Sequence, residues 1–539
     1  MVDFSLPGIG QVLPLTQRLE SRIVEGMNSS RRQFLARTTV AGAAVVAGGS
    51  LTSSASALVR PLAAVGTTRI ALTDVTVIDV ATGHRARHQT VLISGDRIIA
   101  VGRNLPVPHD ATAIDLTGKY VIPGLADMHV HSVGDDRISP PLYLANGLTT
   151  VREMSGNDTV YGWRDRIDAG TLLGPRMIVG SKIIDGDPTL WDTSVIDVHV
   201  VKDEAAARSA VREAKGYGAD FIKVYSRLNP TAYRAILDEA RRQGLTVHGH
   251  GPDQVTIEQA SAAGQRSIEH IHAVALSVSS REHEVRRMLQ AISVQPGGYN
   301  SWFRQLHPIE WIAANSFSQS RAAEVFGTLR RNRTRVTPTL TMHSVLDMPD
   351  YAALDPALKK YLSADALWGF DYAVEQLYKP NRTAEEIARQ RDMWAYRQRF
   401  VGELFAHGVP VLAGTDTGTP YSVPGFSLHQ ELELLVGAGA TPRQALYAAT
   451  VEPARFLGLG DDLGSVTPRT IADLVVLDAD PLTDIRNTRR IHSVVTRGRV
   501  ISPQARSRML ADVEAAVKDP PGTAAIPAGG CCGTRPPGQ

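Results

Sequence analysis

The chain has 539 residues, which is too long for a single ordinary compact core. Hydrophobic residues make up 43% of it, so a largely disordered chain is excluded. Lys and Arg number 57 against 55 Asp and Glu, and this balance indicates neither a nucleic-acid-binding surface nor an acidic tail. The two cysteines, Cys531 and Cys532, are adjacent, which excludes a disulfide framework and a cysteine-based zinc site.

The N-terminal residues 1–57 have the features of an extension followed by an export signal. Arg31 and Arg32 precede Phe-Leu, a short apolar run rich in Gly and Ala follows, and Ala-Ser-Ala at 55–57 has the form of a cleavage site. The apolar run is too short to span a membrane. We therefore expect a twin-arginine-type signal that delivers the protein, through the twin-arginine export machinery, to the periplasm or the outside of the cell.

Two points about this segment stay open. The arginine pair could instead lie by chance on a surface helix, although three consecutive features would then have to coincide. Translation could begin at Met1 or at Met27. After removal of the signal we expect no membrane anchor.

The flanks of the remaining chain are rich in predicted strands. Residues 58–123 alternate β-branched runs with turn residues, and residues 461–510 return to the same pattern. We expect these flanks to pair into one small β-sandwich domain. The final residues, 511–539, are predicted to be a tail whose Pro, Gly and Ala content from Lys518 onward indicates disorder.

Between the flanks, residues 124–460 show strand-then-helix units, which predict an α/β fold of the parallel (β/α)8 TIM-barrel type. The short apolar runs are 177–180, 221–225, 246–250, 267–270, 336–340 and 411–414. Thr256-x-x-Gln259 and Thr441-Pro-x-Gln444 have capping-box form and predict helix starts. Insertions at 275–335 and 343–400 carry many aromatic residues, which are candidates for substrate walls or for packing within the extra helices.

His129 and His131 are the first candidate functional residues. On a strand, alternate residues share a face, so both imidazoles of this His-x-His pair are expected to point the same way. Two neutral imidazoles at one strand end can bind a divalent cation. The preceding Pro-Gly-Leu-x-Asp-x-His sequence strengthens this interpretation considerably.

Lys223 stands among apolar residues in the run Phe-Ile-Lys-Val-Tyr, and it is one of only nine lysines. A buried ammonium without compensation is costly, so this lysine should be paired, neutralised or modified. The alternative is a side chain whose amine extends to the barrel rim.

Further candidates end short predicted strands, where a barrel places its reactive groups. These are His248, His250, His270 and Asp416. Tyr225, His248 and His343 are candidate substrate contacts, and His429 could act likewise or be a core residue. Six other histidines lie in polar or irregular sequence and are set aside: His84, His88, His109, His283, His307 and His492.

In this order, the motifs resemble those of the amidohydrolase superfamily, in its imidazolonepropionase-related and prolidase-like branch with a carboxylated lysine. The resemblance covers about residues 68–500 and includes the closing Ala-Asp-Leu-Val-Val-Leu run at 472–477. It implies six metal-binding residues: His129, His131, Lys223, His250, His270 and Asp416. The first two histidines and the aspartate would bind one divalent ion, the later two histidines the other, and a carbamate formed on the lysine from CO2 would bridge both.

Two departures from the family pattern are visible. Many relatives read His-Ala-His-Gly where this chain has His248-Gly-His250-Gly, and in them the first histidine is the ligand. We choose His250 here because the sequence resembles a subgroup with Gly-His-x-Pro-Asp at this point. The 20-residue step from His250 to His270 also fits. Glu153 stands where relatives more often have Asp. The imidazole and carboxylate ligands suit zinc, with manganese, iron or cobalt as alternatives.

The resemblance implies a metal-dependent hydrolase of amide or peptide-like C–N bonds in a small molecule such as a dipeptide or N-acyl amino acid. Two cations would acidify a bridging water, and Asp416 would act as general base and then acid. Three alternatives remain: a lactone, ester or organophosphate hydrolase, a mononuclear deaminase-type enzyme without need of Lys223, and a secreted binding protein that kept the fold without turnover. Whether the chain forms a homo-oligomer is open.

Overall fold

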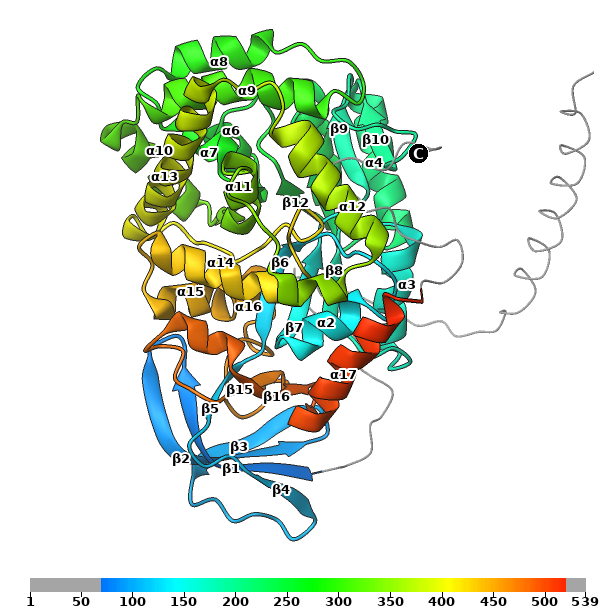
Figure 1. The fold of residues 1–539 in the computed structure, drawn as a ribbon, viewed down its shortest axis with the longest axis vertical. Helices are drawn as coiled ribbons and strands as arrows, with labels where there is room; N and C mark the ends of the chain where they lie inside the picture. Colours follow the sequence, from blue (N-terminus) through cyan, green and yellow to red (C-terminus); the bar gives the residue numbers. More distant parts are fainter. Residues whose placement is uncertain (1–68, 520–539) are drawn as a thin grey trace, which may run out of the picture. The chain divides into compact units, whose positions relative to one another are not determined.

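The computed structural model describes residues 69–519, which form part of one compact unit. The predicted export signal and the cysteine pair lie outside the described residues. The fold is α/β, with one mixed sheet built from the flanks and two parallel sheets between them (Figure 1). Within residues 69–519, no helix combines the length and the apolar character that crossing a membrane requires.

Both flanking segments contribute to one eight-stranded sheet. The N-terminal strands are β1 (Arg69–Asp79), β2 (His84–Ser94), β3 (Arg97–Arg103), β4 (Ala111–Asp115) and β5 (Tyr120–Pro123). The C-terminal strands are β15 (Leu474–Leu477), β16 (Ile491–Thr496) and β17 (Arg499–Ile501). The sheet has the order β17-β16-β15-β5-β1-β2-β3, with β4 paired to β1.

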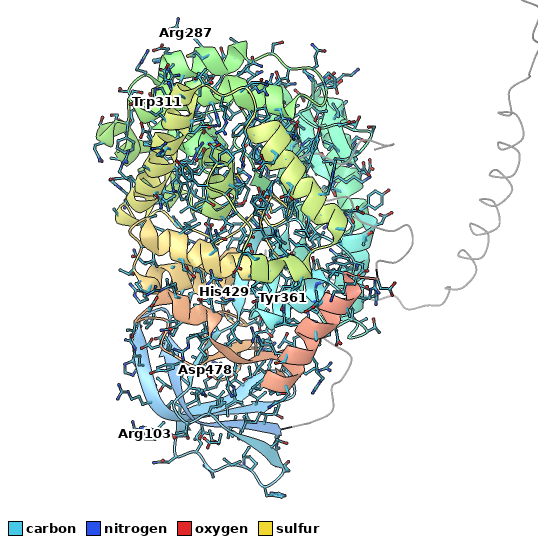
Figure 2. All side chains as sticks on the ribbon, in the orientation of Figure 1. Arg103, Arg287, Trp311, Tyr361, His429 and Asp478 are labelled. Carbon is cyan, nitrogen blue, oxygen red and sulfur yellow. The ribbon has the colours of Figure 1, made fainter. Side chains whose placement is uncertain are left out.

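The two flanks meet where β5 and β15 run antiparallel, with Pro123 opposite Leu474. Residues from both flanks, among them Val91 of β2, Val121 of β5 and Val495 of β16, pack into a common apolar cluster. Figure 2 labels Arg103 and Asp478 in this region. The flanks therefore pair as expected, while a second layer that would make a sandwich stays a prediction.

The strands of the central segment form two parallel sheets. The first has the order β6 (Leu125–Val130), β7 (Leu148–Glu153), β8 (Arg176–Val179). The second has the order β10 (Val198–Val201), β9 (Ile183–Gly186), β11 (Phe221–Val224), β12 (Thr246–Gly249), β13 (Gln265–Glu269), β14 (Arg335–Thr337). The apolar runs expected from residue 177 to residue 340 all contribute strands here, and β9 and β10 are a pair that the sequence pattern did not reveal.

Single parallel bridges connect these sheets and the 411–417 segment. Gly180 pairs with Phe221, Val336 with Val411, and Val130 with Thr417. Because the run at 411–414 makes only isolated bridges, it is not a regular strand in this structure. A closed barrel stays a prediction at this point.

Helices connect the strands and follow the predicted starts. They are α2 (Ser139–Ala145), α3 (Asp158–Asp168), α4 (Glu204–Tyr217), α5 (Pro230–Arg242), α6 (Ile257–Ala262), α14 (Phe426–Gly437), α15 (Pro442–Ala448) and α16 (Val451–Phe456). Both predicted capping boxes are confirmed: Thr256 with Gln259 begins α6, and Thr441 with Gln444 begins α15.

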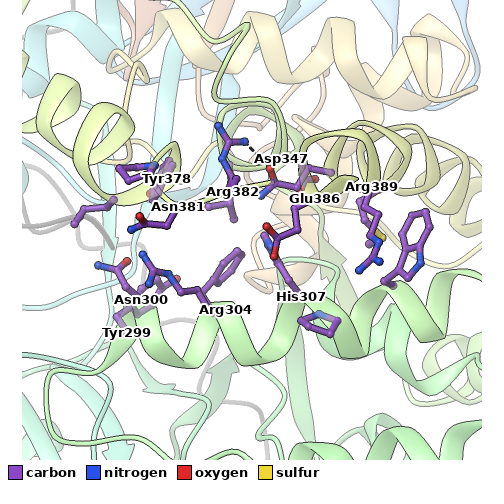
Figure 3. Close-up of a pocket in the computed structure, with 18 residues that line it drawn as sticks. Tyr299, Asn300, Arg304, His307, Asp347, Tyr378, Asn381, Arg382, Glu386 and Arg389 are labelled. Carbon is purple, nitrogen blue, oxygen red and sulfur yellow. Dashed lines mark hydrogen bonds between the residues drawn. The ribbon is translucent and has the colours of Figure 1, made fainter. Parts of the chain in front are cut away.

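The two insertions are almost entirely helical. The first contains α7 (His272–Ser277), α8 (Glu282–Ala291), α9 (Tyr299–Ala314) and α10 (Gln319–Arg331). The second follows α11 (Leu340–Asp347) and contains the 3-10 helix η3 (Pro356–Tyr361), α12 (Ala364–Tyr372), the π-helix η4 (Ala373–Tyr378) and α13 (Ala384–Ala406). They face each other across a pocket (Figure 3).

The C-terminal boundary differs from the prediction. A 3-10 helix η5 (Ile485–Arg489) precedes β16, and α17 (Pro503–Ala516) continues past residue 511, where the tail was expected to begin. Ser502 caps α17, and Val513 and Ala516 are buried against α2 and the second insertion. The apolar face of α17 therefore holds it in place, and residues from 520 onward lie outside the described part.

Candidate metal centre

His129 and His131 lie at the end of β6, all of whose residues are buried. The Asp127 carboxylate fixes this end, since it accepts hydrogen bonds from the His129 amide (3.2 Å) and from the Thr415 amide (3.1 Å) and hydroxyl (2.7 Å). Burial raises the pKa of Asp127 to about 7. The imidazole centroids of the His-x-His pair are 5.5 Å apart.

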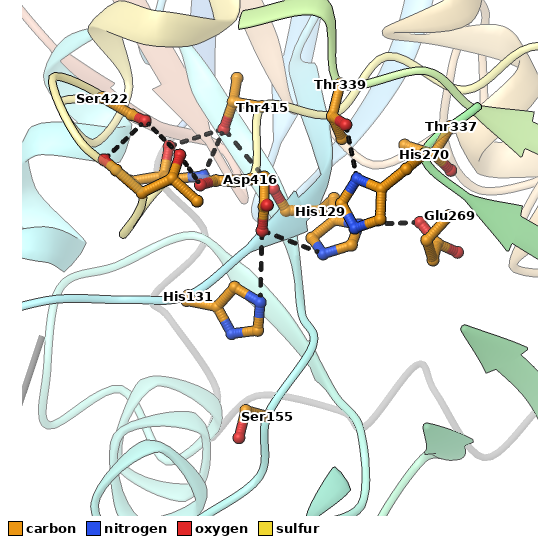
Figure 4. Close-up of polar contacts among 12 residues, drawn as sticks. His129, His131, Ser155, Glu269, His270, Thr337, Thr339, Thr415, Asp416 and Ser422 are labelled. Atoms are coloured by element: carbon orange, nitrogen blue, oxygen red, sulfur yellow. Dashed lines mark hydrogen bonds and ion pairs between the residues drawn. The ribbon is translucent and has the colours of Figure 1, made fainter. Parts of the chain in front are cut away.

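Asp416 lies opposite both histidines (Figure 4). Its Oδ1 is 3.2 Å from His129 Nε2 and 3.3 Å from His131 Nε2. The residue has φ +58°, a left-handed conformation that is uncommon for an aspartate and typical of strained functional positions. Gly414 permits this approach, because a Cβ there would lie 2.9 Å from the His129 backbone nitrogen.

His270 brings the second predicted ligand pair to the same place. Its ring centroid is 4.9 Å from that of His129 and 4.8 Å from that of His250. Nδ1 of His270 lies 2.6 Å from the Thr339 hydroxyl, and Nδ1 of His250 lies 2.9 Å from the Ser226 hydroxyl. These contacts orient each ring by one nitrogen and leave the other for a ligand.

The donor set fits a divalent cation. Ligand atoms of His129, His270 and Asp416 all lie within 4.8 Å of one another, and all three residues are buried. Among the described residues, His129 Nε2, His131 Nδ1 and both Asp416 oxygens lack a hydrogen-bond partner. Buried polar atoms are rarely left unsatisfied, and neutral nitrogens with carboxylate oxygens are the ligands that zinc and similar metals take.

The electrostatics favour the protonation states that metal binding needs. Burial holds the pKa of His250 and of His270 well below the ordinary value, so both imidazoles are neutral near neutral pH. Burial alone would raise the pKa of Asp416, but His129, His131 and His270 together outweigh it and hold the pKa well below its ordinary value. The aspartate is therefore a carboxylate.

Glu269 and Arg152 orient His129 through its Nδ1 atom, and the sequence analysis predicted neither residue as part of the site. Glu269 Oε2 lies 2.9 Å from His129 Nδ1, and Arg152 Nη2 donates to both carboxylate oxygens of Glu269 at 2.9 Å. Burial would raise the pKa of Glu269, but the Arg152 charge together with the contact to His129 holds it well below the usual range. A carboxylate here fixes the His129 tautomer with Nε2 toward Asp416. The sequence signal for Glu269 was its position directly before the predicted ligand His270.

Lys223 is buried within β11, with only 1% of its surface exposed. Its Nζ is 5.9 Å from the ring centroid of Tyr225. Burial and the neighbouring histidines lower the pKa of His250 and of His270, and the positive charge of Lys223 lowers both further. The expected burial of this lysine is confirmed, and a rim position is excluded.

The structure separates His248 from the other histidines. Its ring stacks on Phe221 at 4.4 Å, lies 4.9 Å from Phe456, and faces Arg152 Nη1 at 3.3 Å through Nδ1. Among the described residues it makes no ring contact with another histidine. His250 instead lies beside His270 and packs on the candidate substrate contact Tyr225 at 3.9 Å. A substrate contact by His248 stays a prediction.

Glu153, the unexplained departure from the family pattern, has a local partner. Its Oε2 accepts the Ser132 amide at 2.8 Å, and its Oε1 lies 3.9 Å from His131 Nδ1. The longer glutamate side chain thus reaches the backbone just after His131. It holds the end of β6 rather than taking a place among the ligands.

His343 is the third candidate substrate contact, and it lies next to the metal-binding group. Its ring centroid is 6.3 Å from that of His270 and 4.7 Å from that of His272. The side chain is fully buried, yet neither ring nitrogen has a partner among the described residues. By contrast His429 is a core residue, since it contacts the Thr488 hydroxyl and the Asn146 carbonyl.

A buried ion network next to His272 was missed entirely. Arg397 of α13 binds Glu310 of α9 (3.0 and 3.1 Å) and Asp347 of α11 (2.6 and 3.3 Å). Glu310 also contacts His272 Nδ1 at 2.5 Å. The network joins both insertions to the segment that follows His270. Its members come from four separate helices, α7, α9, α11 and α13, so no local sequence motif predicts them.

Known proteins resemble this chain in sequence and in fold. The model of the Amidohydrolase family matches residues 396–501. Ochratoxinase from Aspergillus niger is 25% identical over 471 residues, covering 75% of this chain and 80% of the relative. Dihydroorotase from Pelotomaculum thermopropionicum is 23% identical over 458 residues, covering 79% and 93% respectively.

Solved structures share the fold. A structure described as a prolidase from Bifidobacterium longum superposes with a TM-score of 0.60 at 23% identity, covering 83% of this chain and 99% of that one. Sequence, site geometry and comparisons agree on one family. Residues 396–501 match the Amidohydrolase family, and the wider chain is similar to members of the amidohydrolase superfamily with prolidase-like structural neighbours, which together indicate a metal-dependent hydrolase.

Proposed function

We propose that this protein hydrolyses an amide or peptide-like C–N bond in a small-molecule substrate. The observation that carries the proposal is the buried His129–His270–Asp416 group, whose ligand atoms lie within 4.8 Å of one another. The relatives named above support the choice of bond, because they belong to a family of hydrolases that act on C–N bonds.

The ligands divide between two divalent metal ions. His129, His131 and Asp416 would hold one, which the two short distances to Asp416 Oδ1 support. His250 and His270 would hold the other, which their adjacent rings support. When bound, divalent cations lower the pKa of water and polarise a carbonyl oxygen.

Lys223 would connect the two sites as a carbamate formed with CO2. Its burial and its nearness to His250 and His270 support this role. An anionic carbamate between two cations is cheaper to bury than an ammonium group beside several imidazoles. Zinc is the proposed metal, with manganese, iron or cobalt as alternatives.

Asp416 would carry the proton. Its Oδ1 faces both histidines of the His-x-His pair, which leaves Oδ2 to accept a proton from the attacking water. The same oxygen would then deliver that proton to the leaving nitrogen, so the residue acts first as general base and then as general acid. Tyr225, which packs on His250, and His343, which lies beside His270, would contact the substrate.

We also propose that the parallel strands close into a barrel that holds these residues. The bridges Gly180–Phe221, Val336–Val411 and Val130–Thr417 each join neighbouring parallel segments, which supports a closed ring of eight. In such a ring the carboxyl ends of the strands meet at one face, where the ligands follow β6, β12, β13 and the 411–414 run.

Metal analysis combined with a substrate panel tests the proposed function. We expect two metal ions per chain, and turnover of dipeptides or N-acyl amino acids that exceeds turnover of lactones and organophosphate esters. Two bound metals with preferred turnover of a lactone or an organophosphate would overturn the bond assignment. One metal per chain would favour the mononuclear alternative, and full metal content with no turnover on any compound would favour a binding protein.

We also propose export through the twin-arginine machinery, on the basis of Arg31-Arg32 and the segment after them. A reporter fused behind residues 1–57 should reach the periplasm or the medium, and replacing both arginines by lysine should retain it in the cytoplasm. Equal export of the two fusions would contradict the assignment.

A further inference from the structure

A pocket of about 220 Å3 lies between α9 of the first insertion and the η4–α13 region of the second (Figure 3). Its volume exceeds the roughly 150 Å3 of an apolar cavity that admits benzene. Aromatic and apolar side chains supply half of the lining residues, among them Tyr299, Phe303, Trp311, Leu377, Tyr378 and Met393. Flat faces of this kind favour an aromatic ring over an aliphatic chain.

His307 supplies a buried polar atom at the pocket. Its Nε2 is shielded from solvent and has no hydrogen-bond partner among residues 69–519, while its ring lies 4.4 Å from Phe303. Burial lowers the pKa of this imidazole to about 4, so it is neutral near neutral pH. An unsatisfied buried nitrogen costs free energy that a hydrogen-bonding ligand would recover. The sequence context had led us to set this histidine aside.

The pocket also contains a cation without an opposite charge beside it. Arg382 binds Asp350, and Arg389 binds Glu385. Arg304 is exposed on α9, and in the described part of the chain it has neither an ion pair nor a hydrogen bond. It is therefore available to an anionic group, with the aromatic walls within the same pocket.

We infer that this pocket binds a small molecule that carries both an aromatic ring and a carboxylate. The ring would lie among the aromatic walls, the carboxylate would meet Arg304, and a polar atom of the molecule would pair with His307. This is a second binding site, and none of its lining residues is a proposed metal ligand.

Two sets of side-chain contacts, one through Phe303 and one through Asp347, connect the pocket with the residues around His270. The Phe303 ring is 5.8 Å from His272, whose ring is 6.2 Å from His270. Asp347 lines the pocket and belongs to the Arg397–Glu310 network that holds His272. The aromatic acid could thus be part of the substrate itself or a separate molecule that acts on turnover, and the chemistry recognised is the same.

Calorimetric titration of the metal-loaded protein tests the site with three probes: 3-phenylpropionate, propionate and 3-phenylpropan-1-ol. We expect 3-phenylpropionate to bind once per chain, and loss of the ring or of the charge to weaken binding. Arg304→Gln should weaken it about fivefold, the range of one exposed ion pair. The exposed Arg287 on α8 lies outside the pocket (Figure 2), so Arg287→Gln is the matched control and should change nothing.

Leu377→Trp fills the pocket and should abolish binding. Because a carboxylate could bind a metal ion directly, 3-phenylpropionate that binds Leu377→Trp with unchanged affinity would overturn the inference, as would the absence of any binding. Competitive inhibition of amide turnover would identify the occupant as part of the substrate, whereas a changed turnover without competition would identify a separate molecule; both support the site. Calorimetry needs no turnover, so failure of the proposed reaction leaves this result readable.

Discussion

Glu269 Oε2 lies 2.9 Å from His129 Nδ1, and this contact turns His129 Nε2 toward Asp416 Oδ1 at 3.2 Å. Removing the charge should therefore weaken metal binding through a residue that touches no metal itself. For Glu269→Gln we expect about a 10–100-fold loss of metal affinity. Competition with a chelator measures it.

The control for this prediction is Glu282→Gln, since Glu282 is a half-buried glutamate on α8 away from the site. Glu269→Gln also leaves Arg152 without its anionic partner, so the thermal midpoint should fall as well. Unchanged metal affinity in a folded Glu269→Gln protein would contradict the role assigned to the contact.

Asp416→Asn separates proton transfer from metal binding. An amide keeps one oxygen for coordination but cannot accept the proton, so we expect most of the metal to remain while turnover falls about 10²–10⁴-fold. Metal content and kcat, measured on the same preparation, check it. Turnover near that of the wild type would exclude Asp416 as the general base.

Lys223→Met tests the carbamate. The apolar side chain has similar length and removes the buried ammonium, so the fold should persist while the second metal is lost. Lys215→Met, at an exposed position on α4, is the control and should keep both metals. In the wild type, reconstitution should depend on added bicarbonate; reconstitution to two metals per chain without CO2 would argue against a carbamate.

Arg397→Met should destabilise the protein in a pH-dependent way. Arg397 and His272 hold the pKa of Glu310 below its ordinary value of 4.5, so this carboxylate stabilises the fold above that pH and the contribution is lost as the pH falls through the lower, folded-state pKa. In the variant, two buried carboxylates lose their cation, which costs about 3–5 kcal/mol near neutral pH.

The thermal midpoints of wild type and variant should therefore differ most near pH 7 and converge as acid neutralises Glu310 and Asp347. Arg399→Met, on the same helix α13, serves as the control. A difference between wild type and Arg397→Met that does not change with pH would show that packing, rather than charge pairing, is what the variant lost.

The sequence predicted the parts of the site that lie at strand ends. His129, His131 and Asp416 were recognisable because a strand alternates its faces and a parallel sheet gathers its carboxyl ends. The capping boxes of α6 and α15 were equally readable, since each depends on residues three positions apart.

Contacts between distant elements could not be predicted in this way. The sequence does not distinguish Arg397 from the other 47 arginines, because its partners on α9 and α11 become neighbours only in the folded structure. His272 and His307 looked ordinary for the same reason. The end of the fold was misplaced because the apolar side of α17 has meaning only against α2 and the second insertion.

The pairing of β5 with β15 has a consequence for the timing of folding. These strands lie next to each other in the sheet but about 350 residues apart in the chain, so β5 keeps an open edge until residues 474–477 have left the ribosome. The sheet is therefore completed only near the end of synthesis, and a chain truncated before β15 should aggregate through that edge. The proposed twin-arginine route exports proteins that have already folded, so this step would be complete in the cytoplasm before the protein leaves it.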